Sequence, residues 1–346
     1  MQDLHCVCFS DIAAIVKAVE PYDDGLMNFA VGTLHDNIQK PPHPAGSREA
    51  YFLGIYHGND LQLTLALAPT DHAWQLGCPQ AVLESFTTPS LKAATDLLAT
   101  SLLDVAHPFI VANVFGDNEI VRTFLESWRA VAATKGIRLR LTDLILDTRS
   151  SYATRQTVAP PPDSPPAFKI VRATIGDFEE LFPTYLDFRT ETVGPRSLDV
   201  EEEHLRFTIA QGTSWLCRIN DALVGFIVLG RVTPKTIAIR HVYVVPEHRR
   251  KGIAGGLVSA VCRYYLGVRP VGYDGIPEGD PTVGIKSFVC INALESAENV
   301  YRKAGFLFPE RTASGLAAGG RDPATGQRAW FRSVLGGVEP EQVSSV

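Results

Sequence analysis

The order of apolar and polar positions repeats once along the chain. Each half begins with a predicted helix that is preceded by or starts at an acid, in the segment from Ser10 in the first half and from Thr174 in the second. A run rich in β-branched and apolar residues follows, interrupted by an Asn-Asp pair at 59–60 and again at 220–221. Asn and Asp tolerate the positive φ of tight turns. Both runs therefore predict β-hairpins.

The second part of each half also follows a common order. The pattern predicts a helix from Leu91 and from Gly252, an apolar strand over 109–115 and 287–292, and a last amphipathic helix over 119–136 and 293–305. The offset between the two series is close to half the chain. This favours a duplicated fold over the alternative, a chance recurrence of common helices and strands.

A proline-rich segment separates the halves. Residues 157–167, TVAPPPDSPPA, contain five prolines and cannot form a helix or a central strand, so they predict an extended linker. We therefore expect one domain over 1–156 and another over 168–335. The polar residues 336–346 predict a flexible tail.

Composition narrows the class of protein. A chain of 346 residues with 45% hydrophobic and 20% charged residues is typical of a soluble protein of two domains. The net charge of −6 argues against a nucleic-acid-binding protein, which would carry a basic face. The six cysteines have no zinc-ligand spacing, and we expect no metal. With neither a basic signal sequence nor an apolar run of about 20 residues, the sequence predicts a cytoplasmic protein without a membrane segment.

One stretch carries a chemical signal. Residues 236–245 read as a strand, and Pro246 marks the point where it ends or splays from its neighbour. Arg249, Arg250 and Lys251 then precede Gly252 at the start of a helix. The N–H groups and the dipole of a helix N-terminus bind anions, and a glycine lets the anion approach the backbone. This stretch therefore predicts a pyrophosphate site; the plainer alternative is a solvated turn.

Two motifs resemble those of the GCN5-related N-acetyltransferases (GNAT). Arg249, Gly252 and Ala254 match the Arg-x-x-Gly-x-Gly/Ala pattern after a strand, and Tyr301-x-x-x-Gly305-Phe306 matches the later Tyr-x-x-x-Gly-Phe. The resemblance covers residues 168 to about 335. It implies an α/β (α+β) fold of two GNAT-like domains, each a mixed, mostly antiparallel sheet flanked by helices. The first half lacks the basic motif and resembles a degenerate copy.

The resemblance also implies acetyl-CoA as the acetyl donor. The amide of Val244 or Val245 would contact the thioester carbonyl, and the pantetheine arm would follow the splayed strand. Tyr301 would donate a proton to the departing thiolate, although a tyrosine at the edge of the core is the alternative. Relatives often carry an Asn where Leu294 stands, which leaves the role of Asn292 open. The expected cofactor-binding residues are Val244, Val245, Arg249, Arg250, Lys251, Gly252, Ile253, Ala254 and Asn292.

The general base and the acceptor site are less specified by the sequence. No acid lies between Asp221 and Glu247, so His241 is the expected base; a structural histidine or a water as base are the alternatives. The segment after the first helix of the second half would border the acceptor, and it supplies Phe188, Arg189 and Glu191, with Tyr243 on the strand. The Gly/Pro-rich loop at 268–286 predicts either a lid or a solvated insert.

The sequence thus predicts an N-acetyltransferase that acts on an amine of a small molecule, as a monomer or homodimer. The alternatives are another CoA-thioester reaction, such as O-acylation or decarboxylation, a protein acetyltransferase, and a non-catalytic acyl-CoA-binding module.

Overall fold

The computed structural model describes residues 4–39, 49–69, 71–164, 166–192, 197–311 and 317–341. The chain forms two compact units, residues 1–150 with 320–346 (unit 1) and residues 151–319 (unit 2). Residues 320–335, expected in the second domain, thus pack with unit 1. Strand β7 (Leu146–Thr154) contributes its residues up to Ser150 to unit 1 and its remaining residues to unit 2.

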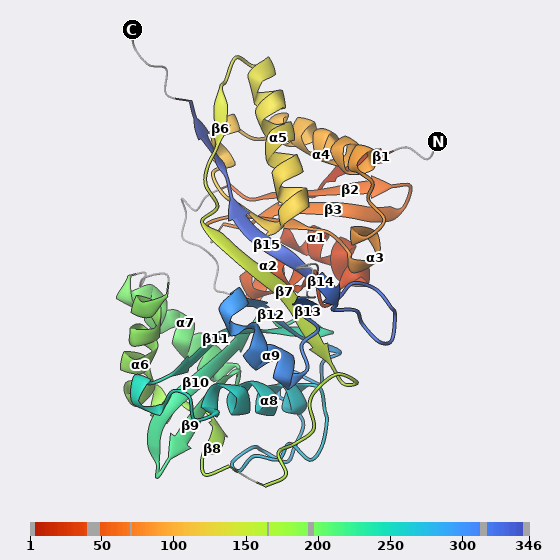
Figure 1. Cartoon of the computed structure of the whole chain (residues 1–346). Helices are drawn as coiled ribbons and strands as arrows, with labels where there is room; N and C mark the ends of the chain where they lie inside the picture. Colours follow the sequence, from red (N-terminus) through yellow and green to blue (C-terminus); the bar gives the residue numbers. More distant parts are fainter. Residues whose placement is uncertain are drawn as a thin grey trace. The chain divides into compact units, whose positions relative to one another are not determined.

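Unit 1 is a mixed sheet flanked by helices (Figure 1). Its strand order is β1-β2-β3-β4-β5-β15-β7, and only β4 and β5 pair in parallel among its described ladders. Its elements are β1 (Leu4–Cys8), α1 (Ile12–Val19), η1 (Glu20–Tyr22), α2 (Asn28–Gln39), β2 (Tyr51–His57), β3 (Asp60–Leu67), β4 (Trp74–Gly77), α3 (Gln80–Leu83), α4 (Thr88–Leu103), η2 (Pro108–Ile110), β5 (Val114–Asp117), α5 (Asn118–Thr134), β6 (Leu139–Leu141), the first part of β7, β15 (Trp330–Gly336) and β16 (Val338–Pro340).

Unit 2 has the same kind of sheet, in the order β7-β12-β11-β10-β9-β8, with β11 and β12 parallel. Its elements are the end of β7, β8 (Lys169–Arg172), η3 (Ile175–Asp177), α6 (Phe178–Glu191), α7 (Leu198–Ala210), β9 (Ser214–Ile219), β10 (Ala222–Gly230), β11 (Thr236–Val244), η4 (Pro246–His248), α8 (Ile253–Tyr265), β12 (Phe288–Ala293), η5 (Glu295–Ala297), α9 (Glu298–Ala304), β13 (Pro309–Arg311) and β14 (Ala317–Gly319). The predicted fold class is confirmed.

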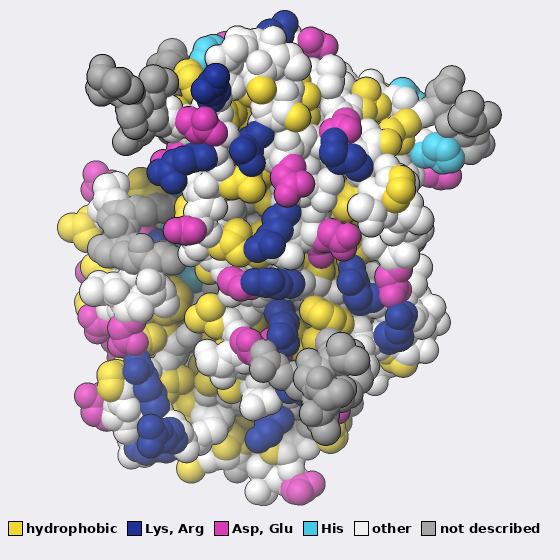
Figure 2. Space-filling model, turned by 45° about the horizontal axis from the view of Figure 1, so that its top comes forward, with side chains coloured by type: hydrophobic (Ala, Val, Ile, Leu, Met, Phe, Trp, Pro, Cys, Tyr) yellow, Lys and Arg dark blue, Asp and Glu magenta, His cyan; other side chains and the backbone are white. Residues whose placement is uncertain are grey.

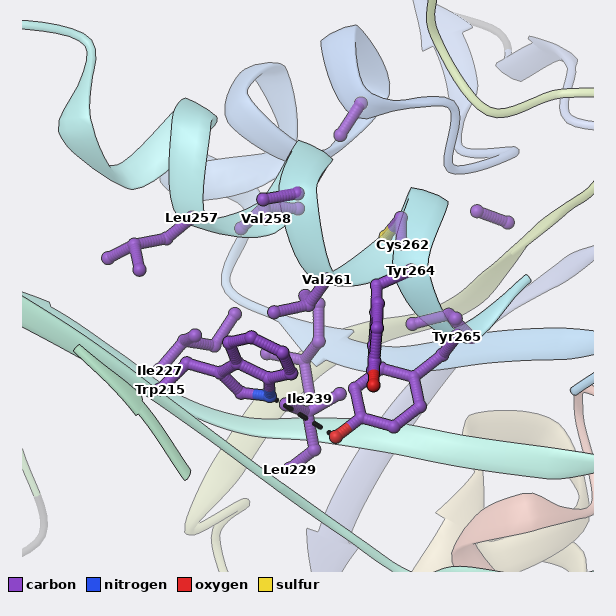
Figure 3. Close-up of a cluster of buried hydrophobic side chains, with 14 of the residues drawn as sticks. Trp215, Ile227, Leu229, Ile239, Leu257, Val258, Val261, Cys262, Tyr264 and Tyr265 are labelled. Carbon is purple, nitrogen blue, oxygen red and sulfur yellow. Dashed lines mark hydrogen bonds between the residues drawn. The ribbon is translucent and has the colours of Figure 1, made fainter. Parts of the chain in front are cut away.

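Successive side chains of a strand point to opposite faces of the sheet, so the core of unit 2 has a part on each face. Trp215 and Ile227 pack toward α8 and α9, whereas the neighbouring residues Leu216 and Phe226 pack toward α6 and α7. Figure 3 shows the first of these clusters, in which the Trp215 Nε1–H donates to the Tyr265 hydroxyl at 3.2 Å. The two helix layers therefore lie on opposite faces of the sheet.

The hairpin turns follow their local sequences. Asn220 and Asp221 both have positive φ, 49° and 65°, as the Asn-Asp signal predicts. In unit 1, His57 pairs with Asp60, so the turn residues are Gly58 and Asn59. The prediction placed this turn one residue later. Gly58, at φ 61°, takes the left-handed conformation without a Cβ penalty.

The ends of the predicted domains are more structured than expected. Residues 336–346 were predicted to form a flexible tail, but β16 pairs with β6 and the Glu341 N–H donates to the Arg138 carbonyl at 3.0 Å. Residues 342–346 lie outside the described residues. The described part of 157–167 forms no helix or strand, yet it packs on unit 2: the Arg263 Nη1–H donates to the Ala159 carbonyl at 2.6 Å.

Surface charge is mixed on the described residues. Figure 2 shows Lys and Arg side chains interspersed with Asp and Glu over the visible face. Among the described residues, no helix is long and apolar enough to span a membrane.

Asp24 in unit 1 gives the stability of the protein a predictable pH dependence. Its carboxylate accepts N–H groups of Leu26, Met27 and Gln80, each at 2.8 Å, but burial raises its pKa to about 6. A pKa above the unfolded value of about 3.9 favours the folded state at low pH, and this contribution is lost as the pH rises through about 6. Because the residue keeps some exposed surface, we expect a loss on the order of 2 kcal/mol between pH 4 and pH 7.

Urea unfolding of the wild type and of Asp24→Asn at several pH values measures this contribution. The variant is expected to be less stable at pH 4, because an amide cannot accept from all three N–H groups, and to lack this pH-dependent component. Asp60→Asn, an exposed acid in the same unit, serves as the control. Equal pH slopes for Asp24→Asn and the wild type would contradict the assignment.

Candidate active site

The predicted anion-binding loop has two residues with positive φ, and only one of them is a glycine. After η4, Arg250 and Gly252 have positive φ, 64° and 79°, and α8 begins at Ile253. The first helical hydrogen bond runs from the Gly256 N–H to the Gly252 carbonyl at 2.9 Å. The N–H groups before Gly256 therefore point out of the helix end. A Cβ on Gly252 would meet no atom within 4 Å, so the space beside this backbone is open.

Gly256 serves packing rather than anion binding. A Cβ at this position would lie 2.6 Å from the ring of Phe168 and 3.3 Å from that of Tyr273. Gly255, in contrast, has open space around its Cβ position. Of the three glycines, Gly252 and Gly255 thus leave the helix end accessible, and Gly256 admits the aromatic side chains beneath it.

The basic residues of the loop divide into two groups. The side chains of Arg250 and Lys251 are exposed beside the helix end. Arg249 turns away from it: its Nε–H donates to the Val244 carbonyl at 2.9 Å, and its Nη2 contacts both carboxylate oxygens of Glu191, at 3.0 and 2.8 Å. Arg249 thus fastens the end of β11 to the end of α6, and its side chain does not line the loop.

A gap opens between two strands next to this loop. β11 pairs with β12 only from Thr236 to Ile239, although β11 continues to Val244 and β12 continues to Ala293. The Val245 N–H donates to the Val224 carbonyl of β10 at 3.1 Å. Because successive N–H groups of a strand point to opposite sides, the N–H of Val244 points toward the gap. Asn292 lies on β12 beyond the paired stretch, half-buried.

Tyr301 lies on α9 at the edge of the α8–α9 core. Its ring meets that of Phe306 edge-on, at 5.7 Å between centroids, and its hydroxyl has no hydrogen bond to the described residues. Burial, with a smaller contribution from Cys262, raises the pKa of Tyr301 to about 12. With a pKa this high, the Tyr301 hydroxyl is protonated at neutral pH and carries a proton that it can donate.

Gly305 ends the helix that carries Tyr301. Its φ is 108°, and a Cβ at this position would lie 2.3 Å from the Thr157 carbonyl oxygen.

The opposite face of the sheet carries a cluster of aromatic rings around His241. The His241 ring lies 4.8 Å from Phe188, 5.6 Å from Tyr185 and 6.0 Å from His204, between centroids. Tyr243, two residues along the strand, lies 6.0 Å from Phe188. The structure thus brings three of the predicted residues together: Phe188, His241 and Tyr243.

His204 is a member of this cluster that the sequence analysis did not single out. It lies on α7, thirty-seven positions before His241 in the sequence, within the run EEEH at 201–204. An acidic run of this kind is typical of the first turns of a solvated helix. The sequence therefore gives no reason to expect His204 in a buried cluster. Only the packing of α7 against the sheet shows that the residue faces His241.

Arg189 occupies a different place from that expected. It was predicted to line the acceptor site, but its side chain is buried, and its Nε–H donates to Glu201 at 2.9 Å. The Tyr185 hydroxyl donates to the other oxygen of Glu201 at 3.0 Å. Removing one partner of a buried ion pair strongly destabilises a protein, because the remaining charge is left buried without compensation. Arg189 and Glu201 therefore hold α6 and α7 together beneath the ring cluster.

Glu191, the last residue of α6, connects Tyr243 of the ring cluster with Arg249 of the loop. Its carboxylate accepts from Arg249 and, at 3.0 Å, from the Tyr243 hydroxyl. These two hydrogen bonds, that of Arg249 first, lower the pKa of the Glu191 carboxyl. A carboxylate stabilised in its charged form is a weak base, so its position suits it to hold Tyr243 and Arg249.

The contacts of the loop at 268–286 lie away from the ring cluster around His241. Tyr273 stacks on Phe168 at 6.3 Å and packs with the α8 core, and the Asp274 carbonyl accepts from the Ile170 N–H of the edge strand β8 at 2.9 Å. The loop therefore covers a sheet edge, and the lid hypothesis has no support from its contacts.

The corresponding helix start in unit 1 differs in chemistry. The N-terminus of α4 is closed by a reciprocal pair of hydrogen bonds, Ser90 N–H to Thr87 Oγ1 at 3.3 Å and Thr87 N–H to Ser90 Oγ at 2.9 Å. Pro89 has no N–H to offer. In the first turn of α4 the Ser90 N–H is therefore occupied and Pro89 supplies no donor, whereas the N–H groups at the start of α8 point out of the helix end. Among the described residues of both units, no three His, Cys, Asp or Glu side chains gather at metal-binding geometry.

Comparison with known proteins finds a family match within the second half of the chain. Residues 178–271, from the start of α6 to beyond α8, match the family model described as the acetyltransferase (GNAT) family. The match contains the first motif, at Arg249 to Ala254, and confirms the resemblance to this family; the second motif, at Tyr301 to Phe306, lies beyond the matched residues. No curated protein sequence matches the chain.

Several solved structures are similar to the whole chain at low identity. A GCN5-related N-acetyltransferase from Sphaerobacter thermophilus has 13% identity and a TM-score of 0.47, with 97% of this chain and 95% of that chain covered. A tandem GNAT protein from the clavulanic acid biosynthesis pathway has 13% identity, a TM-score of 0.45 and 98% coverage of both chains. A GCN5-related N-acetyltransferase from Kribbella flavida has 10% identity, a TM-score of 0.46 and coverage of 92% and 97%.

Proposed function

Because residues 178–271 form a GNAT-family domain, we propose that this protein transfers the acetyl group of acetyl-CoA to an amine of a small molecule. The observation that carries the proposal is the arrangement of three features around one gap between strands. These are the open helix end at Gly252, the Val244 N–H directed into the gap and, on α9 after the second strand of the gap, the protonated Tyr301 hydroxyl, which we propose to face the same gap.

Each feature has a role in binding or proton transfer. The N–H groups at the start of α8, with Arg250 and Lys251, would hold the pyrophosphate. The Val244 N–H would donate to the thioester carbonyl and stabilise the negative charge that develops there during attack. Bound acetyl-CoA supplies an activated acetyl thioester, and Tyr301 would donate its proton to the sulfur that leaves.

The acceptor amine would enter from the face that carries Phe188, His241 and Tyr243. His241 would remove a proton from the ammonium, as a neutral imidazole does near pH 7. Arg249 and Glu191 would position the backbone at Val244. Arg249 donates to the Val244 carbonyl, and Glu191 binds Arg249. These two residues would keep the end of β11 in place while both substrates are bound.

Calorimetric titration with acetyl-CoA, followed by thiol release across a panel of amines, tests the proposal. We expect one acetyl-CoA bound per chain, because unit 1 has no open helix start at the corresponding position. Binding without thiol release for any amine would favour a non-catalytic acyl-CoA-binding module. Absence of binding at millimolar acetyl-CoA would overturn the proposal itself.

Gly255→Glu is expected to separate helix stability from acetyl-CoA binding. A carboxylate in the first turn of α8 suits the helix dipole, and the open space at Gly255 admits the side chain, so thermal stability should stay the same or rise. The same charge would repel the pyrophosphate and weaken acetyl-CoA binding by about tenfold, or roughly 1.4 kcal/mol. Gly255→Gln, equal in size and uncharged, is the control. Equal affinities of the two variants would contradict the predicted pyrophosphate position.

A further inference from the structure

The acceptor side of unit 2 contains a second histidine whose position suggests a function. His204 and His241 come from different elements, α7 and β11, and their rings meet in a T-shaped arrangement at 72° with 6.0 Å between centroids. Both side chains are half-buried. At this separation a proton can pass from one imidazole to the other through a single intervening water.

The surroundings hold both rings in place. Phe188 and Tyr185 flank the His241 ring on the α6 side, and the Tyr185 hydroxyl is fixed by the buried carboxylate of Glu201. Glu201 lies one turn before His204 on α7 and is itself held by Arg189. The ion pair thus positions the ring next to His241 and also the helix that carries His204.

The reaction requires a path for one proton. An ammonium nitrogen loses two protons when it becomes an acetamide: one is balanced by the proton that the CoA thiol gains, and the other must reach solvent. His241, between Tyr185, Phe188 and His204, takes up the latter proton, but it must release the proton before the next turnover. Of the described rings that meet His241, Phe188 is apolar and the Tyr185 hydroxyl already donates to Glu201, whereas the imidazole of His204 is able to accept a proton.

We propose that His204 accepts this proton from His241 and passes it to solvent, so that the two histidines form a proton relay on the acceptor side. The proposal rests on the proposed acetyl transfer and adds a residue and a step to it. Among the described residues, the charged or titratable groups near His241 include His204, Tyr185, Arg189 and Glu201 on the α6–α7 side, and Arg240 and the Tyr243–Glu191 pair along β11. Opposite His241, β10 contributes the apolar residue Val228.

Steady-state kinetics of His204→Gln, His241→Gln and the double variant test the relay. We expect His204→Gln to lower kcat by about 10- to 100-fold with the KM for acetyl-CoA unchanged, because the proton release step is lost. The double variant is expected to be no slower than His241→Gln, since a relay fails as one unit. Added imidazole should restore part of the activity of His204→Gln. His57→Gln, an exposed histidine of unit 1, should match the wild type.

Two results would overturn the relay. One is a kcat of His204→Gln within twofold of the wild type while acetyl-CoA binding is intact. The other is a double variant whose loss equals the product of the two single losses. If His204→Gln fails to fold, His204→Asn provides the same comparison.

A measurement that does not depend on turnover separates this proposal from the proposed function. Imidazole NMR titration of the wild type and of His204→Gln reports the coupling of the two rings even if no amine is acetylated. A His241 titration curve that is the same in both proteins would overturn the relay. A changed curve, together with absence of turnover by the wild type, would support the pairing and count against acetyl transfer.

Discussion

Ending the chain at Gly319 is expected to unfold unit 1. The deletion removes β15 and β16, and with them the buried side chains of Phe331, Val334 and Val338. Burial of such a side chain contributes about 1.5–3 kcal/mol. The combined loss approaches the whole stability of a domain, about 5–15 kcal/mol. It also exposes the edge of β5, which pairs with β15 from Val114 to Asp117.

Hydrogen exchange measures this loss by unit. The deletion should remove the protection of amides in β3, β4 and β5, whereas a chain ending at Glu341 should keep it. The anchoring contacts explain the contrast: Glu84 accepts from the Arg328 N–H at 2.9 Å and pairs with Arg321 at 2.8 Å, and the Thr148 hydroxyl lies 2.7 Å from that of Ser333. Protection of unit 1 amides in the shorter chain would contradict the assignment of residues 320–341 to this unit.

Tyr301→Phe is expected to lower kcat by about 100-fold or more, because the proposed general acid is lost and only a hydroxyl is removed. The edge-on contact with Phe306 remains, so thermal stability and acetyl-CoA affinity should change little. With a pKa of about 12, the wild-type hydroxyl stays protonated up to about pH 11, and activity should show no alkaline loss from this residue below that pH.

Single-turnover thiol release with saturating acetyl-CoA is the appropriate measurement, since it reports the chemical step. Tyr273→Phe is the matched control, because Tyr273 packs against the same core cluster but stacks on Phe168 and lies outside the two motifs. A Tyr301→Phe enzyme with the wild-type rate would show that Tyr301 is a core residue, the alternative that the sequence leaves open.

The conformation of the loop at Gly252 could be predicted because the features that specify it are local. A helix N-terminus, a glycine with positive φ and adjacent basic residues lie within a few positions of one another, so the sequence from Arg249 to Ala254 specifies the feature. The same holds for the hairpin at Asn220 and Asp221 and for the glycine after α9. In each case a short-range backbone requirement selects the residue type.

The destination of the Arg249 side chain was not predictable in this way. Its charge and its place in the motif suggested a phosphate contact, but its partners are Val244 and Glu191, and Glu191 lies fifty-eight positions earlier. The folded sheet brings the end of α6 to the end of β11, and an arginine then binds the nearest carboxylate and carbonyl. The burial of Arg189 against Glu201 has the same origin.

By itself, the sequence determined the order of elements in both halves, the loop at Gly252 and the Tyr301 motif, because periodicity and turn chemistry act over a few residues. Only the tertiary structure decided that residues 320–341 complete unit 1, that the 268–286 loop covers a sheet edge and that His204 meets His241. These outcomes depend on pairing between segments far apart in the chain. The local sequence of a segment does not specify which distant strand or helix will pack against it.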